Sequence, residues 1–222
     1  MSVRIDLFWS FRSPYSFMCT PQALELPKDF DVEIDVRIVM PKALRTPDFF
    51  SPDSEPRIRY ILMDWKRRAK LLGLPHGWPN PDPIVQDMDT LKIAPNEEQI
   101  YIFRLMRLGV EAQRRGRGLE FIHEVGHLIW SGTPDWDKGD HLTKAAERAG
   151  LNLDDMEKTI AKDPANYDAE VEDNHKRLAA LPHWGVPTFG YHQEPFFGQD
   201  RIDSLRFQLE EDGLTRAVAC AV

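Results

Sequence analysis

The first 40 residues carry the pattern that most constrains the fold. Residues 3–9 (VRIDLFW) place apolar side chains at every second position, which indicates a strand. A helical segment follows over residues 14–26, with Pro14 at its first position, where proline is favoured. Residues 31–40 (DVEIDVRIVM) alternate again, after a connection long enough for one helical crossover. The chain therefore opens as β-α-β, and its first turn, SFRS, places Ser13 at the start of the helix.

Helical patterns dominate the middle of the chain. Residues 57–72 and the long stretch from 96 to 181 carry apolar side chains three and four positions apart, the spacing of one helix face. Gly or Pro stands where each run ends or pauses. We therefore expect an all-helical block placed inside an α/β chain.

Strand patterns return near the C-terminus. Residues 186–191 and 194–197 are predicted as two short strands joined by a tight turn, and a helix from about residue 200 to 211 closes the chain. The order β-α-β, helices, β-β-α is the thioredoxin arrangement, so we predict an α/β fold of this type with a large all-helical insertion. The predicted division is a thioredoxin-like domain over residues 1–53 and 180–222 and a helical insertion domain over residues 54–179.

Length and charge limit the classes of partner. The 222 residues, 42% hydrophobic and with a formal net charge of -8, suit a globular chain that buries a sizeable core. A nucleic-acid surface needs clustered cations, so the short basic runs at residues 66–70 and 114–117 are interpreted as solvated helix faces or anion contacts. No segment approaches membrane-spanning length, and a strand pattern begins at once. We expect a cytoplasmic protein with neither nucleic acid nor membrane as partner.

Two residues lie at positions in this arrangement where catalysis or ligand binding is expected. Ser13 begins a helix, where free backbone N–H groups and a partial positive charge stabilise an anion. Pro187, in GVPTF, begins a predicted strand, where a cis peptide bond would turn the backbone of Val186 outward toward an extended ligand. Each residue also has a purely structural interpretation, since serine is a common helix N-cap and a trans proline is common at a strand edge.

Three segments, in this order, carry a family resemblance: SPYS (13–16), WGVPTF (184–189) and FFGQDRIDSL (196–205). Together they resemble the 2-hydroxychromene-2-carboxylate isomerases and the related kappa-class glutathione transferases. The resemblance implies a DsbA-like thioredoxin domain with a helical insertion, glutathione as cofactor and a homodimer.

The resemblance also implies roles for individual residues. Ser13 is expected to hydrogen-bond the glutathione sulfur, at the position where disulfide oxidoreductases of the same fold have a reactive cysteine. A hydroxyl that donates to a thiolate at a helix N-terminus lowers the pKa of the thiol. Val186, beside a cis Pro187, is expected to pair with the cysteinyl backbone. Gln199 and Asp200 are expected to hold the γ-glutamyl end at the start of the last helix.

Substrate contacts are predicted near Ser13 and after the second strand. Arg12 and Tyr15 flank Ser13, and an arginine there would either meet a carboxylate or be a solvated turn residue. Lys42 and Arg45 would offer cations to the glycine carboxylate of glutathione or to an acidic substrate. The Gly-Asn pair that many members of the family have in this loop is missing, so the natural substrate stays open.

The resemblance implies a glutathione-dependent isomerase. The thiolate of glutathione would add reversibly to an unsaturated acid from aromatic degradation, such as 2-hydroxychromene-2-carboxylate, and leave after rotation about the saturated bond. Phe11, Trp65 and Trp130 are candidates for its apolar walls. The alternatives are a kappa-like glutathione transferase, which keeps the adduct as product, and a non-catalytic binding protein on the same scaffold.

A rival motif lies in the helical block. His123, Glu124 and His127 form an HExxH pattern, which is typical of zinc hydrolases, and Glu147 follows at a distance that suits a third ligand. Gly126 weakens the helix, and the same segment aligns with an ordinary helix of the isomerase insertion, so we predict no metal. A redox role would rest on Cys19 alone, because Cys220 is at the extreme tail.

Overall fold

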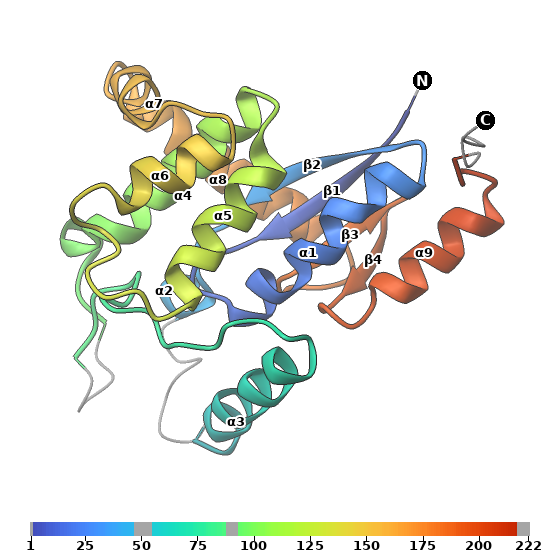
Figure 1. Ribbon diagram of the computed structural model, residues 1–222, viewed down its shortest axis with the longest axis horizontal. Helices are drawn as coiled ribbons and strands as arrows, with labels where there is room; N and C mark the ends of the chain where they lie inside the picture. Colours follow the sequence, from blue (N-terminus) through green and yellow to red (C-terminus); the bar gives the residue numbers. More distant parts are fainter. Residues whose placement is uncertain (1, 47–54, 88–92, 217–222) are drawn as a thin grey trace.

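The computed structural model describes residues 2–46, 55–87 and 93–216, and its centre is a mixed four-stranded sheet (Figure 1). The strand order is β2-β1-β3-β4. The first two strands are parallel, and β3 runs antiparallel to both of its neighbours. The strands are β1 (Val3–Trp9), β2 (Val32–Ile38), β3 (Thr188–Tyr191) and β4 (Glu194–Phe197). The predicted α/β framework β-α-β … β-β-α is confirmed.

The helix α1 (Pro14–Asp29) joins the two parallel strands and crosses in front of the sheet, between α5 and α9 (Figure 1). It begins at Pro14 as predicted, but it continues beyond residue 26 and includes Pro27 in its last turns. Proline removes one donor from a helix without preventing the turns on either side. The closing helix α9 (Ile202–Glu211) starts two residues later than predicted.

The predicted helical insertion is present between the two halves of the sheet. Its elements are α3 (Glu55–Leu71), η3 (Asn96–Glu98), α4 (Ile100–Arg114), α5 (Gly118–Trp130), α6 (His141–Arg148), α7 (Leu153–Ile160) and α8 (Pro164–Ala180), and the short α2 (Lys42–Arg45) follows β2 before the insertion. The last two, α7 and α8, follow each other closely in the chain. Asp163 separates them, because its side chain caps α8 by accepting the N–H of Asn166 at 3.3 Å.

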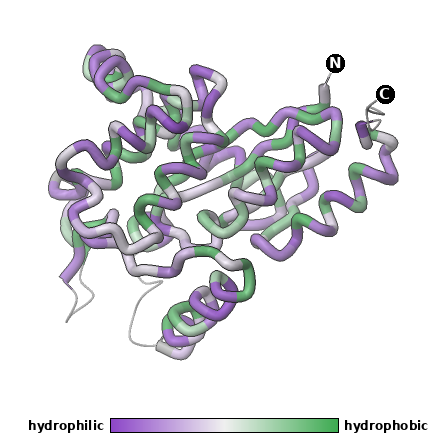
Figure 2. The backbone as a smooth tube through the Cα atoms, in the orientation of Figure 1, coloured by the Kyte–Doolittle hydropathy of each residue, from purple (hydrophilic) through white to green (hydrophobic). Residues whose placement is uncertain are grey.

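One apolar core extends from the sheet into the insertion. Gly109 of α4 shows how closely the two parts pack, since a Cβ there would lie 2.8 Å from Cγ1 of Ile38 and 3.1 Å from the ring of Phe11. Hydrophobic stretches follow the sheet and α5, whereas α3 carries both hydrophobic and hydrophilic segments (Figure 2). The predicted boundary near residue 53 lies outside the described residues. None of the helices in the described part is long and apolar enough to cross a membrane.

Candidate active site

A cavity of about 700 Å³ lies where β1 ends, between the sheet and α3. We call the residues from the thioredoxin framework the sheet wall, those from α3 and the following loop the helical wall, and those around α2 the basic corner. The sheet wall comprises Ser10, Arg12, Ser13, Pro14, Tyr15, Trp184, Gly185, Val186, Pro187, Phe197, Gly198, Gln199 and Asp200. The helical wall comprises Ile58, Tyr60, Ile61, Leu62, Asp64, Trp78 and Gln86, and the basic corner comprises Pro41, Lys42, Ala43 and Arg45.

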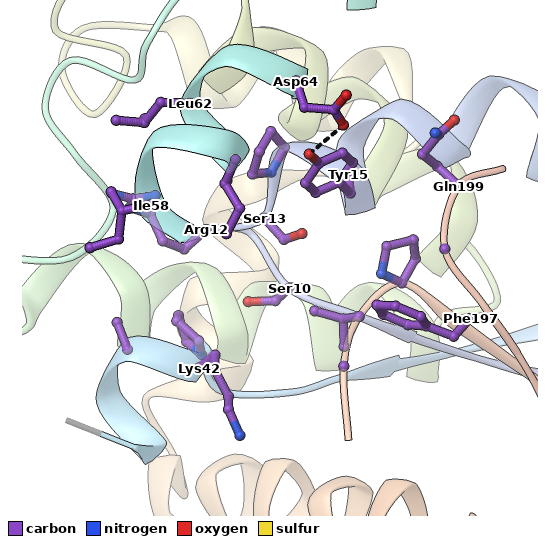
Figure 3. A pocket seen from close by; sticks show the side chains of 18 of the residues that line it. Ser10, Arg12, Ser13, Tyr15, Lys42, Ile58, Leu62, Asp64, Phe197 and Gln199 are labelled. Atoms are coloured by element: carbon purple, nitrogen blue, oxygen red, sulfur yellow. Dashed lines mark hydrogen bonds between the residues drawn. The ribbon is translucent and has the colours of Figure 1, made fainter. Parts of the chain in front are cut away.

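Ser13 lies at the N-terminus of α1 on the sheet wall, facing the cavity (Figure 3). Its Oγ accepts the N–H of Ser16 at 3.1 Å, so the residue is a helix N-cap. A hydroxyl that accepts one hydrogen bond still has its own proton to donate. The structural and the chemical interpretations of Ser13 are therefore compatible, because capping uses a lone pair and leaves the O–H available to an anion.

The Val186–Pro187 peptide bond is cis, and both residues line the cavity. The carbonyl of Pro187 accepts the N–H of Gly198 at 2.9 Å, which joins this loop to the end of β4. Within the described ranges, the amide of Val186 has no hydrogen-bond partner. The sheet wall thus presents a free backbone amide opposite the start of α1.

Gln199 and Asp200 line the cavity from the loop before α9, and not from the helix start that the sequence suggested. Gln199 is 5% exposed, and its Oε1 accepts the Nε of Arg68 at 3.1 Å. Asp200 is exposed and forms an ion pair with Arg201 at 2.9 Å. Asp200 therefore remains accessible to a ligand, whereas Gln199 also connects the two walls.

Arg12 is held by the loop after α3. Its Nη2 donates to Oδ2 of Asp82 at 2.7 Å, its Nε donates to Oδ1 of the same carboxylate, and its guanidinium lies 4.6 Å from the ring centre of Trp78. The side chains of Arg12 and Asp82 are each only 13% exposed. The interpretation of Arg12 as a solvated turn residue is wrong, and its charge is already compensated by Asp82.

Tyr15 also reaches across to the helical wall. Its hydroxyl donates to Oδ2 of Asp64 at 2.8 Å, as Figure 3 shows. Burial raises the pKa of Tyr15, and the adjacent Asp64 raises it further. The hydroxyl therefore stays protonated and serves as a fixed donor to α3.

The basic corner is positively charged. Burial lowers the pKa of Lys42, as do the nearby Arg45 and Arg57. Burial also lowers the pKa of Arg45, whose Nε donates to the carbonyl of Met40 at 2.9 Å. Burial and the charge of Arg45 lower the pKa of His175, on α8, to about 4. The carboxylate of Glu172, also on α8, offsets part of this charge, since it acts to raise the pKa of Arg45.

The aromatic lining differs from the one suggested by the sequence. Phe11, Trp65 and Trp130 are fully buried and do not line the cavity. The aromatic rings that do line it are those of Tyr15, Tyr60, Trp78, Trp184 and Phe197. Trp184 is 63% exposed at the rim and stacks on His183, which stacks in turn on Phe197. A planar ligand entering the cavity would meet exposed ring faces.

The HExxH residues are engaged with other side chains. His123 Nδ1 lies 3.0 Å from the hydroxyl of Thr20, and Glu124 pairs with Arg148 at 2.6 Å. His127 lies next to Ser131. Among residues 2–46, 55–87 and 93–216, no three side chains of metal-ligating type come together. This helix therefore gives the zinc interpretation no ligand set.

Cys19 lies one turn beyond the start of α1 and is completely buried. Its thiol donates to the carbonyl of Ser16 at 3.1 Å, and burial raises its pKa. A thiol in this environment is a poor nucleophile, because reactivity requires the thiolate. Cys220 lies outside the described residues.

Several residues of the site were missed by sequence reasoning. Asp64 and Arg68 belong to a helix that was predicted correctly, but helical periodicity does not show which polar side chains reach across to another element. Asp82 follows a proline-rich turn whose path the sequence leaves open. Ser10 lines the cavity and is 1% exposed. It belongs to the turn SFRS, three residues before Ser13, so its position in the sequence could have indicated that it lies near the site.

The model of the DSBA-like thioredoxin domain matches residues 4–210. The chain belongs to this family. Among curated protein sequences no match was found.

Solved structures of the family support the fold. A 2-hydroxychromene-2-carboxylate isomerase is similar over 95% of this chain and 96% of its own, with a TM-score of 0.63 and 20% identity. The cytosolic disulfide reductase DsbM from Pseudomonas aeruginosa is similar over 94% of this chain and 100% of its own, with a TM-score of 0.59 and 14% identity. A second structure of DsbM contains GSH, with a TM-score of 0.57. At these identities the likeness establishes the thioredoxin-like fold.

Proposed function

We propose that the protein is a glutathione-dependent isomerase of an unsaturated aromatic-degradation acid such as 2-hydroxychromene-2-carboxylate. The observation that carries the proposal is the Ser13 hydroxyl, which caps α1 through its oxygen and keeps its proton for a ligand. A dithiol mechanism at this position has no support, since Ser13 replaces the cysteine and Cys19 is sealed in the core.

The sheet wall offers what a glutathione molecule needs. The free amide of Val186 suits pairing with an extended peptide backbone, and the exposed carboxylate of Asp200 suits an ammonium group. A cavity of about 700 Å³ has room for a tripeptide together with a second ligand. Bound glutathione would supply the thiolate that adds reversibly to a conjugated double bond.

Residues of the chain would stabilise the thiolate and bind the aromatic acid. Ser13 would donate to the sulfur and keep it ionised, helped by the N-terminus of α1. The exposed rings of Tyr60, Trp184 and Phe197 would receive an aromatic ligand, and Lys42 in the basic corner would attract its carboxylate.

The homodimer and the cytoplasmic location belong to the same proposal. Exposed apolar side chains of Met63 and Leu71 on α3, which do not line the cavity, are compatible with burial against a second copy. Light scattering of the purified chain would test the dimer.

The test is a titration of the ultraviolet thiolate absorbance of glutathione in the presence of the protein. We expect bound glutathione to ionise well below the pH at which the free thiol does, and Ser13→Ala to lose this shift. Ser13→Thr, which keeps both the cap and the hydroxyl, should retain most of it. Asn152→Ala removes a comparable N-cap from α7, far from the cavity, and should leave the shift unchanged.

The titration also separates the alternatives. Glutathione that does not bind, or binds with an unshifted thiol, contradicts the proposal and favours a non-catalytic binding protein. A shifted thiol followed by release of free glutathione after turnover supports the isomerase. Accumulation of a stable glutathione adduct would assign the site to a kappa-like transferase instead.

A further inference from the structure

Gly185 sets the direction of the free amide of Val186. A Cβ at Gly185 would lie 2.5 Å from Cε2 of Phe197 and 3.1 Å from Cε1 of His183, so a side chain has no room there. Glycine also has more backbone freedom than any other residue. A loop that presents one amide to a ligand directly after a glycine therefore needs other groups to fix its backbone.

Two side chains hold the peptide groups on either side of Gly185. Nδ1 of His183 accepts the N–H of Gly185 at 3.0 Å, and the hydroxyl of Thr188 donates to the Gly185 carbonyl at 2.8 Å. The Gly185 carbonyl and the Val186 N–H belong to one planar trans peptide group, in which they point in opposite directions. Fixing both peptide groups of Gly185 thus fixes the direction of the Val186 amide.

The ring of His183 is itself held between two aromatic rings. Its centre lies 3.8 Å from the ring centre of Phe197 and 4.6 Å from that of Trp184. Phe197, labelled in Figure 3, and Trp184 line the cavity, whereas His183 does not. Because its Nδ1 accepts a backbone N–H, the ring is neutral and carries its proton on Nε2. His183 therefore acts on a ligand only through the loop.

We propose that His183 is a positioning residue of the glutathione site, whose unprotonated Nδ1 holds the Gly185 N–H and thereby keeps the Val186 amide directed into the cavity. This role rests on the proposed function in taking that amide as a contact of the glutathione backbone. A proton on Nδ1 would remove the acceptor and set two N–H groups against each other. The loop therefore needs a neutral His183, and acidification should weaken binding.

The rings packed against His183 in the described part of the chain are uncharged. They belong to Trp184, on the same loop, and to Phe197, on β4. Burial lowers the pKa of His183, which keeps the ring neutral at pH 7. Ionisable side chains also line the cavity, among them Asp64 and Asp200. A test by pH must therefore separate their titration from that of His183.

Binding of S-methylglutathione between about pH 7.5 and pH 5, measured by calorimetry, tests this role. The probe keeps the backbone of glutathione and has no thiol to ionise. His183→Asn keeps an acceptor on Cγ, because an Asn side chain bonds the N–H two residues on, but this acceptor cannot be protonated. His183→Phe keeps a stacked ring and has no acceptor.

The two variants should behave in opposite ways. We expect the affinity of the wild-type protein to fall several-fold on acidification, whereas His183→Asn binds as the wild type does at neutral pH and keeps its affinity in acid. His183→Phe should bind roughly 3- to 10-fold more weakly throughout, because one hydrogen bond that orders the loop is lost. Asp64 and Asp200 are present in all three proteins, so the comparison isolates the proton on His183.

His192→Asn is the matched control. His192 also packs on an aromatic ring, that of Tyr191, in the turn between β3 and β4, and it does not line the cavity. The same substitution there should leave both the affinity and its pH dependence as in the wild type.

Nuclear magnetic resonance gives a second readout without ligand. The amide resonance of Gly185 should follow the titration of the His183 ring in the wild-type protein and stay constant over the same range in His183→Asn. A Gly185 resonance that does not respond to the ring would overturn the proposed role.

Three results of the binding experiment would overturn it as well. They are wild-type affinity in His183→Phe, a loss in His183→Asn equal to that in His183→Phe, and wild-type affinity that stays constant while the His183 ring titrates. Failure of the proposed function is distinct, because wild-type protein would then not bind S-methylglutathione at any pH. That result would also remove the site that His183 is proposed to position, even where the Gly185 resonance follows the ring.

Discussion

The sheet wall of the cavity is continuous with the core, whereas α3, which carries most of the helical wall, has few buried side chains. Trp9 and Phe11, on either side of Ser10, are completely buried. Among residues 56–71 of α3, only Trp65 and Ala69 are buried to this degree. Polar contacts that join α3 and the loop after it to the rest of the molecule include Tyr15 to Asp64, Gln199 to Arg68 and Arg12 to Asp82.

This difference separates two tasks. In the proposed function Ser13 stabilises a thiolate, and the core gives it the fixed position that this role requires. The helical wall, in contrast, has few buried contacts, so less free energy is needed to open it locally. This property suits a surface that binds substrates of different shape. The comparison predicts that changes in the helical wall alter stability and substrate affinity but leave thiol ionisation intact.

The largest expected effect comes from removing the buried ring of Trp65, which anchors α3 to the core. Trp65 packs against Trp78 and Trp130, with ring centres 6.3 and 5.5 Å apart, and Trp65→Ala should lower the free energy of unfolding by about 3–5 kcal/mol. Urea denaturation measures this. Tyr60→Ala, on the exposed side of the same helix, should change stability by less than about 0.5 kcal/mol. Equal losses in both variants would contradict the conclusion that α3 is held to the core mainly through Trp65.

The next effect is the loss of the Arg12–Asp82 pair. Asp82→Asn leaves a mostly buried guanidinium without its carboxylate and should cost about 2–4 kcal/mol. The double variant Arg12→Met, Asp82→Leu should recover part of this loss, as a double-mutant cycle would show. Glu25→Gln, which breaks the exposed pair with Lys28, is the control and should cost less than about 1 kcal/mol.

Acid should weaken the molecule through His175, which packs beneath the basic corner. The folded state binds this proton only near pH 4, while the unfolded chain binds it near the ordinary pKa of about 6.5. The unfolded state therefore holds more protons between these values, and the free energy of unfolding falls as the pH falls from about 6.5 to 4.

The full contribution of His175 is present above pH 6.5 and should amount to about 1–3 kcal/mol. His175→Gln should flatten the dependence of unfolding on pH in this window. His76→Gln, at an exposed histidine, is the control. A slope that persists unchanged in His175→Gln would assign the acid sensitivity to other groups.

A smaller effect is expected at the Tyr15–Asp64 contact. Tyr15→Phe removes one hydrogen bond to a carboxylate and should cost about 1 kcal/mol. Asp64 would then face the cavity unpaired and raise the KM of an acidic substrate several-fold. Tyr191→Phe removes a similar bond, to Asp212, away from the cavity. It should cost as much stability without changing KM, and a matching KM effect would exclude the role assigned to α3.

The smallest effect on stability is predicted for Trp184. Its ring is 63% exposed, so Trp184→Ala should change the free energy of unfolding by less than about 0.5 kcal/mol. Loss of stacking should nevertheless weaken binding of an aromatic acid by roughly 2- to 10-fold. Phe207→Ala, at an equally exposed ring on α9, should affect neither quantity. Unchanged affinity of Trp184→Ala for the aromatic acid would show that Trp184 is not part of the substrate site.

The sequence was a better guide to the sheet wall than to the helical wall. Alternation and the Pro14 start predicted β1, α1 and the position of Ser13, because these depend on neighbours in the chain. The sequence also predicted α3 as a helix. It did not indicate that Asp64 would meet Tyr15, since that contact depends on how α3 is placed in space. The error over Phe11, Trp65 and Trp130 has the same cause, because burial is decided by packing and not by residue type.

The burial of Cys19 has a consequence for the conditions in which the protein can work. Hydrogen peroxide and disulfides attack exposed thiolates, and in the described part of the chain the only sulfhydryl group is enclosed and protonated. Under the proposed function, oxidative stress would therefore inactivate the site by depleting glutathione and not by oxidising Cys19. Activity lost in this way should return when reduced glutathione is added back, without any reduction of the protein.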